Sequence, residues 1–230
     1  MILLRSLNNS SCIGQYIIKD VWGQPPDSTA GWSASTSSYV SSCNNQTIIG
    51  GYNKFGPGGW ARKTYYDLPG HNTVSITWDA YFLDSWDGVS GDTGNYDIYI
   101  LEVDNTIRYA DVYEKNLNSS TDYCGNDEWP DLIKTVTTGT FNHNSTSITL
   151  YFRATLNQGH GEDESFGFKN VKITVNVICT PACATCFGND ITECYSCNNG
   201  WYLNGSTCVT DCGAGYWNNP SGRVCTGKLS

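Results

Sequence analysis

The cysteines of this 230-residue chain are distributed very unevenly. Eight of the eleven lie between residue 179 and the C-terminus, at positions 179, 183, 186, 194, 197, 208, 212 and 225. A segment this short and this poor in apolar residues cannot bury a sufficient core, and thiols at such density persist where they are oxidised to disulfides. The spacing therefore predicts a module stapled by disulfides in an extracellular or cell-surface protein.

The two CxxC pairs in this segment, Cys183 with Cys186 and Cys194 with Cys197, allow two other interpretations. One is a tetrahedral zinc site, but only seven residues separate the pairs and four further cysteines would be left unexplained. The other is a thioredoxin-like redox site, which is disfavoured because neither pair has a βαβ pattern or basic neighbours that would lower a thiol pKa. Disulfides remain the favoured interpretation.

The charge balance excludes several classes of partner. The chain has 13 Lys and Arg against 22 Asp and Glu, giving a net charge of −9, and no basic cluster. A nucleic-acid backbone or an anionic membrane is therefore a poor partner. No run of 18 apolar residues occurs, so we expect no membrane span.

The first residues, MILLR, are too short for the apolar region of a signal peptide. A secreted chain needs an export signal, so we expect this sequence to be a mature or partial chain, with Met1 not necessarily the initiator. Six N-x-[ST] motifs predict N-linked glycans, at Asn8, Asn9, Asn45, Asn118, Asn144 and Asn204. Asn8 and Asn9 overlap, so we expect only one of these two to be used.

Hydrophobic alternation with a period of two predicts strands between residues 68 and 178. Residues 74–82 place Val74, Ile76, Trp78, Ala80 and Phe82 on one face, and 96–100, 148–154 and 171–177 follow the same rule. Clusters of Gly, Asn, Asp and Ser separate them as turns. The sequence therefore predicts an all-β chain with a jelly-roll-like β-sandwich at 19–178, after an N-terminal extension at 1–18. Ile48, Ile49 and Trp60 are predicted to contact its core.

Two segments of the predicted sandwich, HNTVSITWDAYFLDSWDG at 71–88 and LNQGHGEDESFG at 156–167, resemble a jelly-roll module of secreted and surface proteins of protists, ciliates especially. In those proteins a furin-like or growth-factor-receptor-like cysteine-rich repeat follows directly, as the segment at 179–230 would here. Phe166 stands where that family tends to carry Trp. The resemblance implies a surface protein in which such repeats act as rods and spacers without catalytic chemistry.

The same resemblance implies a connectivity for the C-terminal cysteines: Cys179 with Cys186, Cys183 with Cys194, Cys197 with Cys208, and Cys212 with Cys225. Cys12, Cys43 and Cys124 remain, an odd number. We expect one internal bridge among them, either Cys43 to Cys124 or Cys12 to Cys43, and the sequence does not choose between the two.

Acidic residues gather in two predicted loops: Asp84, Asp87 and Asp92 in one, and Glu162, Asp163 and Glu164 in the other. Carboxylates from two loops suit Ca²⁺, and we predict a structural calcium site with Asp84, Asp87, Asp163 and Glu164 as candidate ligands. The alternative is a pair of solvated acidic turns. The same carboxylates could also form the acid and base of a glycoside hydrolase, although the sequence shows no cleft between them.

Aromatic side chains in predicted loops are candidates for stacking on sugars: Trp32, Tyr52, Trp60 and Trp129. The competing interpretation is that each anchors the core or a loop. His71, His143 and His160 lack a metal-ligand spacing or a nucleophile motif, and we interpret them as ordinary loop or strand-end residues.

These observations predict a non-catalytic extracellular glycoprotein with a structural or adhesive role, requiring no cofactor. The main alternative is a calcium-stabilised carbohydrate-binding module that takes glycans as partners, and a glycoside hydrolase comes third. Self-association into a filament or coat is a further expectation, because residues 1–18 could add as a strand to the sheet edge of a neighbour. The alternative is that they form a frayed N-terminus or an edge strand of their own domain.

Overall fold

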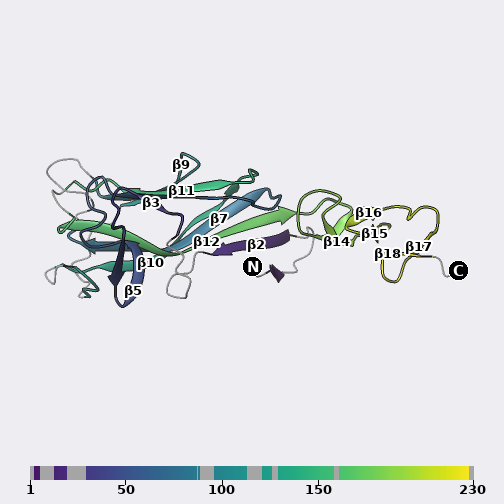
Figure 1. Ribbon diagram of the computed structural model, residues 1–230, viewed down its shortest axis with the longest axis horizontal. Helices are drawn as coiled ribbons and strands as arrows, with labels where there is room; N and C mark the ends of the chain where they lie inside the picture. The colour runs from purple at the N-terminus through teal and green to yellow at the C-terminus, as the bar shows by residue number, and fades with distance from the viewer. Residues whose placement is uncertain are drawn as a thin grey trace.

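The computed structural model describes residues 3–5, 13–19, 30–86, 88, 96–112, 121–125, 129–157 and 161–227. These residues form eighteen strands and no helix, so none of them belongs to a helix that could cross a membrane. Figure 1 shows an elongated molecule with a β-sandwich at one end and a smaller module at the C-terminal end. The prediction of an all-β sandwich followed by a disulfide-rich region is confirmed.

The larger sheet of the sandwich is built around its longest strand, β12 (Glu164–Ile178). One edge of β12 pairs antiparallel with β7 along nearly its whole length, while the other edge pairs first with β5 and then with β2. The remaining strands extend the sheet outward from these partners. The seven strands are β1 (Leu3–Arg5), β2 (Ile13–Lys19), β4 (Val40–Cys43), β5 (Gln46–Gly50), β7 (Thr73–Asp84), β10 (Leu132–Asn142) and β12.

The second sheet has five strands in the order β3-β6-β11-β8-β9. Its members are β3 (Ser33–Ala34), β6 (Trp60–Tyr65), β8 (Ile98–Val103), β9 (Thr106–Val112) and β11 (Ile148–Ala154). Hydrogen-bonded neighbours in this sheet are all antiparallel. Because one face of each strand is buried against the larger sheet, the other face is left for solvent or a ligand.

The core lies between the two sheets and is largely aromatic. The predicted alternation in β7 is correct, since Val74, Ile76, Trp78, Ala80 and Phe82 all lie in the main buried cluster. The Trp78 ring centroid lies 5.1 Å from that of Tyr109, 5.5 Å from Phe152 and 6.5 Å from Tyr99. The alternation in β11 is also correct, because Ile148, Leu150, Phe152 and Ala154 are core residues. Such pairs add to the stability that burial alone provides.

The predicted facing of the strand at 96–100 is wrong. Tyr96 is exposed, and the core-facing residues of β8 are Tyr99, Leu101 and Val103. Ile98 and Ile100 lie on the opposite face of the strand. The alternation was ambiguous because residues 98 to 101 are apolar without a break, which leaves the register to be decided by the neighbouring strands.

Two tight turns fix the register of the hairpins in the sandwich. Asn44 and Asn45 connect β4 to β5, and Asp104 and Asn105 connect β8 to β9, all four with positive φ between 50° and 64°. Two-residue hairpin turns with positive φ at both positions favour Asn and Asp. Gly50, with φ of +82°, ends β5 where a Cβ would lie 2.4 Å from the Phe55 ring.

The N-terminal segment joins the chain's own sheet. β2 pairs antiparallel with the second half of β12, and β1 pairs with β2. For residues 3–5 and 13–18, the described part of the segment 1–18, this is the expected alternative in which the segment pairs within its own domain. The domain boundary expected at residue 19 therefore falls at the end of a sandwich strand.

The C-terminal module follows β12 directly. Its strands form a two-stranded sheet of β13 (Cys183–Cys186) and β14 (Cys194–Cys197), and a four-stranded sheet of β15 (Tyr202–Asn204), β16 (Thr207–Val209), β17 (Tyr216–Asn219) and β18 (Val224–Gly227). Val177 at the end of β12 packs in one cluster with the cysteines of the module. The module therefore continues the long axis from the sandwich (Figure 1).

Five disulfides connect described residues. Four lie in the module, Cys179–Cys186, Cys183–Cys194, Cys197–Cys208 and Cys212–Cys225, the pairs that the family resemblance implies. The fifth, Cys43–Cys124, ties β4 to a loop 81 residues further along the sandwich. It is one of the two internal bridges left open by the sequence, and Cys12 lies outside the described residues.

Candidate functional site

The outer face of the five-stranded sheet carries the most suggestive group of side chains. Alternation along β6 buries Ala61 and Tyr65 in the core and turns Trp60, Arg62 and Thr64 outward. Alternation along β11 likewise turns Thr149, Tyr151 and Arg153 outward. The antiparallel pairing of these two strands therefore collects aromatic, cationic and hydroxyl groups on one regular surface.

The register arranges these side chains in rows across the sheet. One row runs Ser33, Arg62, Tyr151 and Glu102 over four strands, and the next contains Trp60, Arg153 and Ile100. The ring centroids of Trp60 and Tyr151 lie 5.8 Å apart, with an angle of 42° between the ring planes. Both rings are partly exposed. Two neighbouring aromatic rings on a sheet face present an apolar platform surrounded by hydrogen-bonding groups.

Some polar groups of this face form hydrogen bonds or ion pairs with one another, whereas the Arg62 guanidinium makes none with a described side chain. Arg153 Nε donates a hydrogen bond to Glu102 Oε1 at 2.8 Å, which also makes an ion pair. The hydroxyls of Thr64 and Thr149 are 2.9 Å apart and share a hydrogen bond. The exposed guanidinium of Arg62 has no acidic partner among the residues whose side chains are described.

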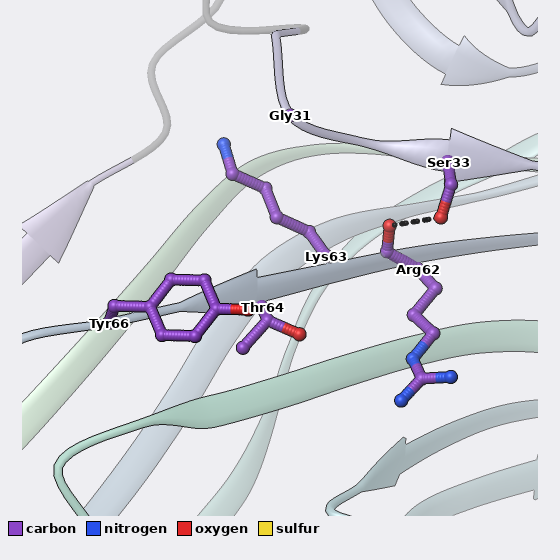
Figure 2. Close-up of a pocket in the computed structure, with 6 residues that line it drawn as sticks. All are labelled: Gly31, Ser33, Arg62, Lys63, Thr64 and Tyr66. Carbon is purple, nitrogen blue, oxygen red and sulfur yellow. Dashed lines mark hydrogen bonds between the residues drawn. The ribbon is translucent and has the colours of Figure 1, made fainter.

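Two shallow depressions adjoin one another on this face. The first has a volume of about 390 Å³ and is lined by Trp60, Arg62, Glu102, Asn105, Thr149 and Tyr151. The second, of about 320 Å³, is lined by Gly31, Ser33, Arg62, Lys63, Thr64 and Tyr66. Figure 2 shows the second one, where Arg62 and Lys63 point away from one another and the Ser33 hydroxyl donates to the Arg62 carbonyl oxygen. Arg62 lines both depressions and so lies at their junction.

Of the four predicted sugar-stacking residues, only Trp60 lies on this face. Trp32 is 6% exposed and packs in the core, with its ring centroid 4.9 Å from that of Phe168, so it cannot serve as a sugar platform. Tyr52 packs against the cluster of Cys43, Ile48, Tyr81 and Leu83, and Trp129 is half-buried just before β10. Tyr151 and Arg62 were not predicted.

Of residues 48, 49 and 60, which were predicted to contact the core, two are buried and the third lies on the outer face. Ile49 lies in the main buried cluster, as expected, whereas Ile48 is fully buried in the separate cluster with Cys43, Tyr81 and Leu83. Trp60 instead lies partly exposed on the outer surface of β6. The strand period explains the difference, because Ala61 takes the inward position next to it.

The predicted acidic residues are only partly brought together. Asp84 and Glu164 are cross-strand partners at the ends of β7 and β12, and they are 1% and 0% exposed. Asp163 accepts a hydrogen bond from the Ser85 hydroxyl, Glu162 accepts one from the Asn53 amide, and Asp87 and Asp92 lie outside the described residues. The side chains of Asp84 and Glu164 are thus almost fully buried, whereas the acid and base of a glycoside hydrolase must face a bound sugar.

A buried aspartate that the sequence did not single out holds this end of the sandwich together. The Asp131 carboxylate accepts hydrogen bonds from the backbone N–H groups of Asp84, Tyr123 and Cys124, each at 2.9 Å. Burial raises the pKa of Asp131, while these three bonds act in the opposite direction. The chain approaches closely here, since a Cβ on Gly125 would lie 2.5 Å from Asp84 Oδ1.

Two histidines interpreted from sequence as ordinary residues form a hydrogen-bonded chain. His71 Nδ1 lies 2.6 Å from the Pro69 carbonyl oxygen, and its Nε2 lies 2.6 Å from His143 Nδ1. His143 Nε2 lies 3.1 Å from Asp104 Oδ2 in the turn between β8 and β9. Burial lowers the pKa of His71. The chain therefore connects the two sheets at one end of the sandwich, and His160 lies outside the described residues.

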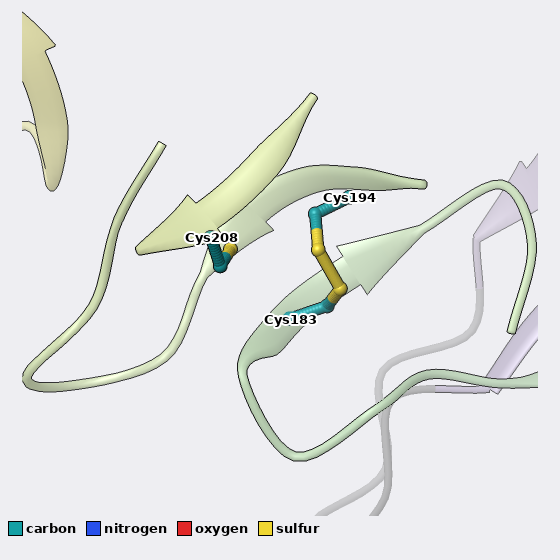
Figure 3. A group of neighbouring side chains, drawn as sticks. All are labelled: Cys183, Cys194 and Cys208. Carbon is teal, nitrogen blue, oxygen red and sulfur yellow. A yellow bond between two sulfur atoms is a disulfide. The ribbon is translucent and has the colours of Figure 1, made fainter. Parts of the chain in front are cut away.

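Metal binding by the cysteines is not supported by their arrangement. Among the described residues, groups of three or more His, Cys, Asp or Glu with ligand atoms within 4.8 Å are Cys183, Cys194 and Cys208, and Cys43, Cys124 and Asp131. Figure 3 shows the first group, in which Cys183 and Cys194 share a disulfide while Cys208 is bonded to Cys197. Sulfur atoms in disulfides are not the thiolates that bind zinc.

Three predicted glycosylation sites have exposed side chains, as attachment of a glycan requires: Asn45, Asn144 and Asn204. Asn45 occupies the turn between β4 and β5. Asn8, Asn9 and Asn118 lie outside the described residues. Occupancy of these sites stays a prediction.

No protein-family model and no curated protein matches the chain. Among solved structures it is similar to the CBM36-1 domain of a multidomain xylanase from the hindgut metagenome of Trinervitermes trinervoides, with 14% identity over 69% of this chain and 95% of that one and a TM-score of 0.38. It is also similar to the C-terminal CBM6 of a marine laminarinase from Zobellia galactanivorans, with 11% identity, coverage of 69% and 99%, and a TM-score of 0.37. A third similar structure is a xylan-binding module, CBM15, with 14% identity over 70% of this chain and 97% of that one and a TM-score of 0.34.

Proposed function

We propose that this protein is a non-catalytic, extracellular carbohydrate-binding protein whose binding face is the outer surface of the five-stranded sheet. The observation that carries the proposal is the pair of partly exposed rings of Trp60 and Tyr151, 5.8 Å apart on neighbouring strands. Aromatic faces stack on the C–H faces of sugars, and the surrounding polar groups bind the hydroxyls. Arg62, Glu102 and Thr149 supply such groups within the same depression.

The alternative role for the ring pair is cross-strand stabilisation of the sheet. Cross-strand aromatic pairs do stabilise sheets, by about 0.2–1 kcal/mol. That role does not need a depression beside the rings or cationic and hydroxyl groups around them. Sugar binding accounts for the platform, the depression and the polar rim together.

A glycan array followed by isothermal titration calorimetry tests the proposal. We expect Trp60→Ala to weaken binding of the best glycan by about tenfold or more, since a lost stacking contact of about 1.5 kcal/mol corresponds to that factor. Trp217→Ala, at a 55% exposed tryptophan in the C-terminal module, is the matched control and should leave the affinity unchanged. Equal affinity of the Trp60 variant and the original protein would contradict the proposed face.

Calcium is proposed as a structural ion rather than as part of the sugar contact. Asp84 and Glu164, paired across β7 and β12, would supply carboxylate oxygens, the ligands that Ca²⁺ prefers. A cation between them would offset the repulsion between two buried carboxylates. We expect Ca²⁺ to raise the melting temperature, and Asp84→Asn to abolish that increase. An unchanged melting temperature from EDTA to millimolar Ca²⁺ would remove calcium from the proposal.

A structural contribution of the C-terminal module is the second candidate function. The module leaves the sandwich along the long axis of the molecule and is stapled by four disulfides (Figure 1). Such a segment would hold the sandwich at a distance from its attachment point. Small-angle scattering of the whole chain, compared with a chain ending at residue 178, would show a correspondingly larger maximum dimension.

A further inference from the structure

We propose that the binding face takes an anionic saccharide, with the Arg62 guanidinium binding a carboxylate or sulfate group on the sugar. This inference rests on the proposed function, because it names the class of ligand for the same face. It follows from the position of Arg62 on the face and from the hydrogen bonds and ion pairs that the nearby charged residues already make.

Arg62 differs from the other arginines whose side chains the structure describes. Arg153 pairs with Glu102, Arg223 donates to the Cys197 carbonyl oxygen at 3.1 Å, and Arg108 lies 4.3 Å from the centroid of the Phe141 ring. The Arg62 guanidinium is exposed and makes no such contact with any described side chain. Within that set, its planar group of five donors is the one left for a ligand.

The acidic groups near this face are already engaged. Glu102 Oε1 accepts the hydrogen bond from Arg153. Asp104, in the turn after β8, accepts the backbone N–H of Thr149 at 2.9 Å with one oxygen and lies 3.1 Å from His143 with the other. With Glu102 paired to Arg153, the positive charge of Arg62 has no carboxylate paired with it among the described side chains, in a chain of net charge −9.

The position of Arg62 suits a charged substituent on a stacked sugar ring. Its cross-strand partners are Tyr151 on one side and Ser33 on the other. Directly opposed side chains have Cβ atoms about 4.5–5.5 Å apart, which is close to the width of a sugar ring. A ring stacked on Tyr151 or Trp60 would therefore hold a carboxylate or sulfate within reach of the guanidinium, which binds such groups with two parallel hydrogen bonds.

The location of Arg62 between the two depressions also favours a chain longer than one sugar. A polysaccharide lying across the sheet would pass from the depression at Trp60 to the one at Tyr66, with Arg62 between them. An acidic residue at the junction would meet Arg62, while its neighbours in the chain occupy the depressions. We therefore expect oligosaccharides to bind more tightly than the corresponding acidic monosaccharide.

Calorimetric titration with pairs of ligands that differ only in charge tests the proposal. The first pair is oligogalacturonate and its methyl ester, and the second is carrageenan oligosaccharides and their desulfated, neutral form. We expect the charged member of at least one pair to bind about three- to tenfold more tightly, because an exposed charge-assisted contact is weaker than a buried one. The pair that shows the preference identifies carboxylate or sulfate as the recognised group, and added NaCl should reduce it.

Variants at one position separate this inference from the function on which it rests. Arg62→Gln should remove the preference for the charged ligand, so that the two members of a pair bind with equal affinity. Arg62→Lys should retain part of the preference, because the charge stays while the paired hydrogen bonds are lost. Lys172→Gln, which removes one charge from β12 in the other sheet, is the matched control and should retain all of it.

The outcomes are distinct. Equal affinities of the original protein for both members of each pair, with Trp60→Ala still weakening them, would overturn the role of Arg62 while supporting the sugar-binding face. A preference for the charged ligand that survives Arg62→Gln would also overturn it. Failure of the original protein to bind any of the four ligands or any glycan on an array would overturn both proposals.

Discussion

The sandwich and the C-terminal module are both built from β-strands, yet different forces hold them in shape. The sandwich encloses a continuous cluster of aromatic and aliphatic side chains, of which Trp78, Tyr99, Phe152 and Phe166 are fully buried. In the module, five of the six described residues that are buried in its cluster are cysteines, and Val177 of β12 completes the cluster. Tyr216 and Trp217 lie at the surface, 50% and 55% exposed, while Trp201 packs against the cluster and is partly buried. The module therefore depends on covalent bonds where the sandwich depends on burial.

The disulfides themselves sharpen this contrast. Closing an 11-residue loop, as Cys183–Cys194 and Cys197–Cys208 do, is expected to contribute about 3 kcal/mol through the unfolded chain. The same account gives about 4–5 kcal/mol for Cys43–Cys124, which spans 81 residues of the sandwich. The strongest individual bridge thus lies in the region that needs it least.

Reduction of all disulfides should separate the two regions most clearly. We expect the module to lose its fold completely, because little apolar area is left to hold it, while the sandwich stays folded. Hydrogen exchange in the presence of dithiothreitol measures this: amides of residues 183–227 should lose protection and those of β7 should keep it. Replacing Cys43 and Cys124 by Ser is the control and should lower the stability of the sandwich without unfolding it. Retained protection in the reduced module would show that it has a sufficient core of its own.

Trp78→Ala should destabilise the sandwich, the region that reduction of the disulfides is expected to leave folded. Removing a fully buried ring that contacts Tyr99, Tyr109 and Phe152 is expected to cost the sandwich about 3–5 kcal/mol. The same substitution at the exposed Trp217 should change stability by no more than about 0.5 kcal/mol. Chemical denaturation of both variants, followed by tryptophan fluorescence, provides the comparison. Equal losses at the two positions would mean that the aromatic residues of the module are as important as those of the sandwich.

Asp131→Ala probes a polar element of the sandwich. The substitution leaves three backbone N–H groups without their acceptor, and we expect a loss of roughly 3 kcal/mol, since each unsatisfied buried donor costs about 1–3 kcal/mol. Asp211→Ala in the module is the matched control, because Asp211 accepts one N–H, from Gly213, in an exposed turn. Its expected cost is about 1 kcal/mol or less. Similar costs in the two variants would contradict the central position given to Asp131.

The sequence predicted much of this architecture because alternation and cysteine spacing are local signals. The strand at 148–154 was assigned with the correct inward face, which already implied that Tyr151 and Arg153 point outward. The outward direction of these side chains could have pointed to the candidate site, but Tyr151 was not predicted as a site residue. The strand at 96–100 could not be oriented in this way, because its apolar residues occupy both faces.

Burial of single aromatic residues was beyond local signals. Trp32 and Trp60 both lie in a Gly- and Ser-rich stretch, yet one packs on Phe168 in the core and the other lies on the outer face. The difference arises from the pairing of β6 with β3 on one side and with β11 on the other, which is a tertiary property. The contact of His71 with His143 likewise joins residues 72 positions apart and has no motif.

The pair of histidines supplies the smallest and last of the expected effects. Burial lowers the pKa of His71 below its usual value of about 6.5, and a proton added to its Nε2 would lie between this atom and His143 Nδ1, which are 2.6 Å apart. A base whose pKa is lower in the folded state is protonated first in the unfolded state, so its contribution is present above about pH 6.5 and is lost as the pH falls.

The sandwich should therefore lose stability between pH 7.5 and 5 in a way that the module does not share, since the chain's three histidines all lie upstream of residue 179. Asp104, next to His143, is the charged group that faces this pair from the other sheet. We expect the melting temperature of the sandwich to fall by a few degrees over this range, and the fall to be smaller in His71→Asn, whose side chain does not titrate. Calorimetry of both proteins across the pH range measures the difference, and hydrogen exchange at the same pH values assigns it to one region. An identical pH dependence in the variant would show that His71 is not the group responsible.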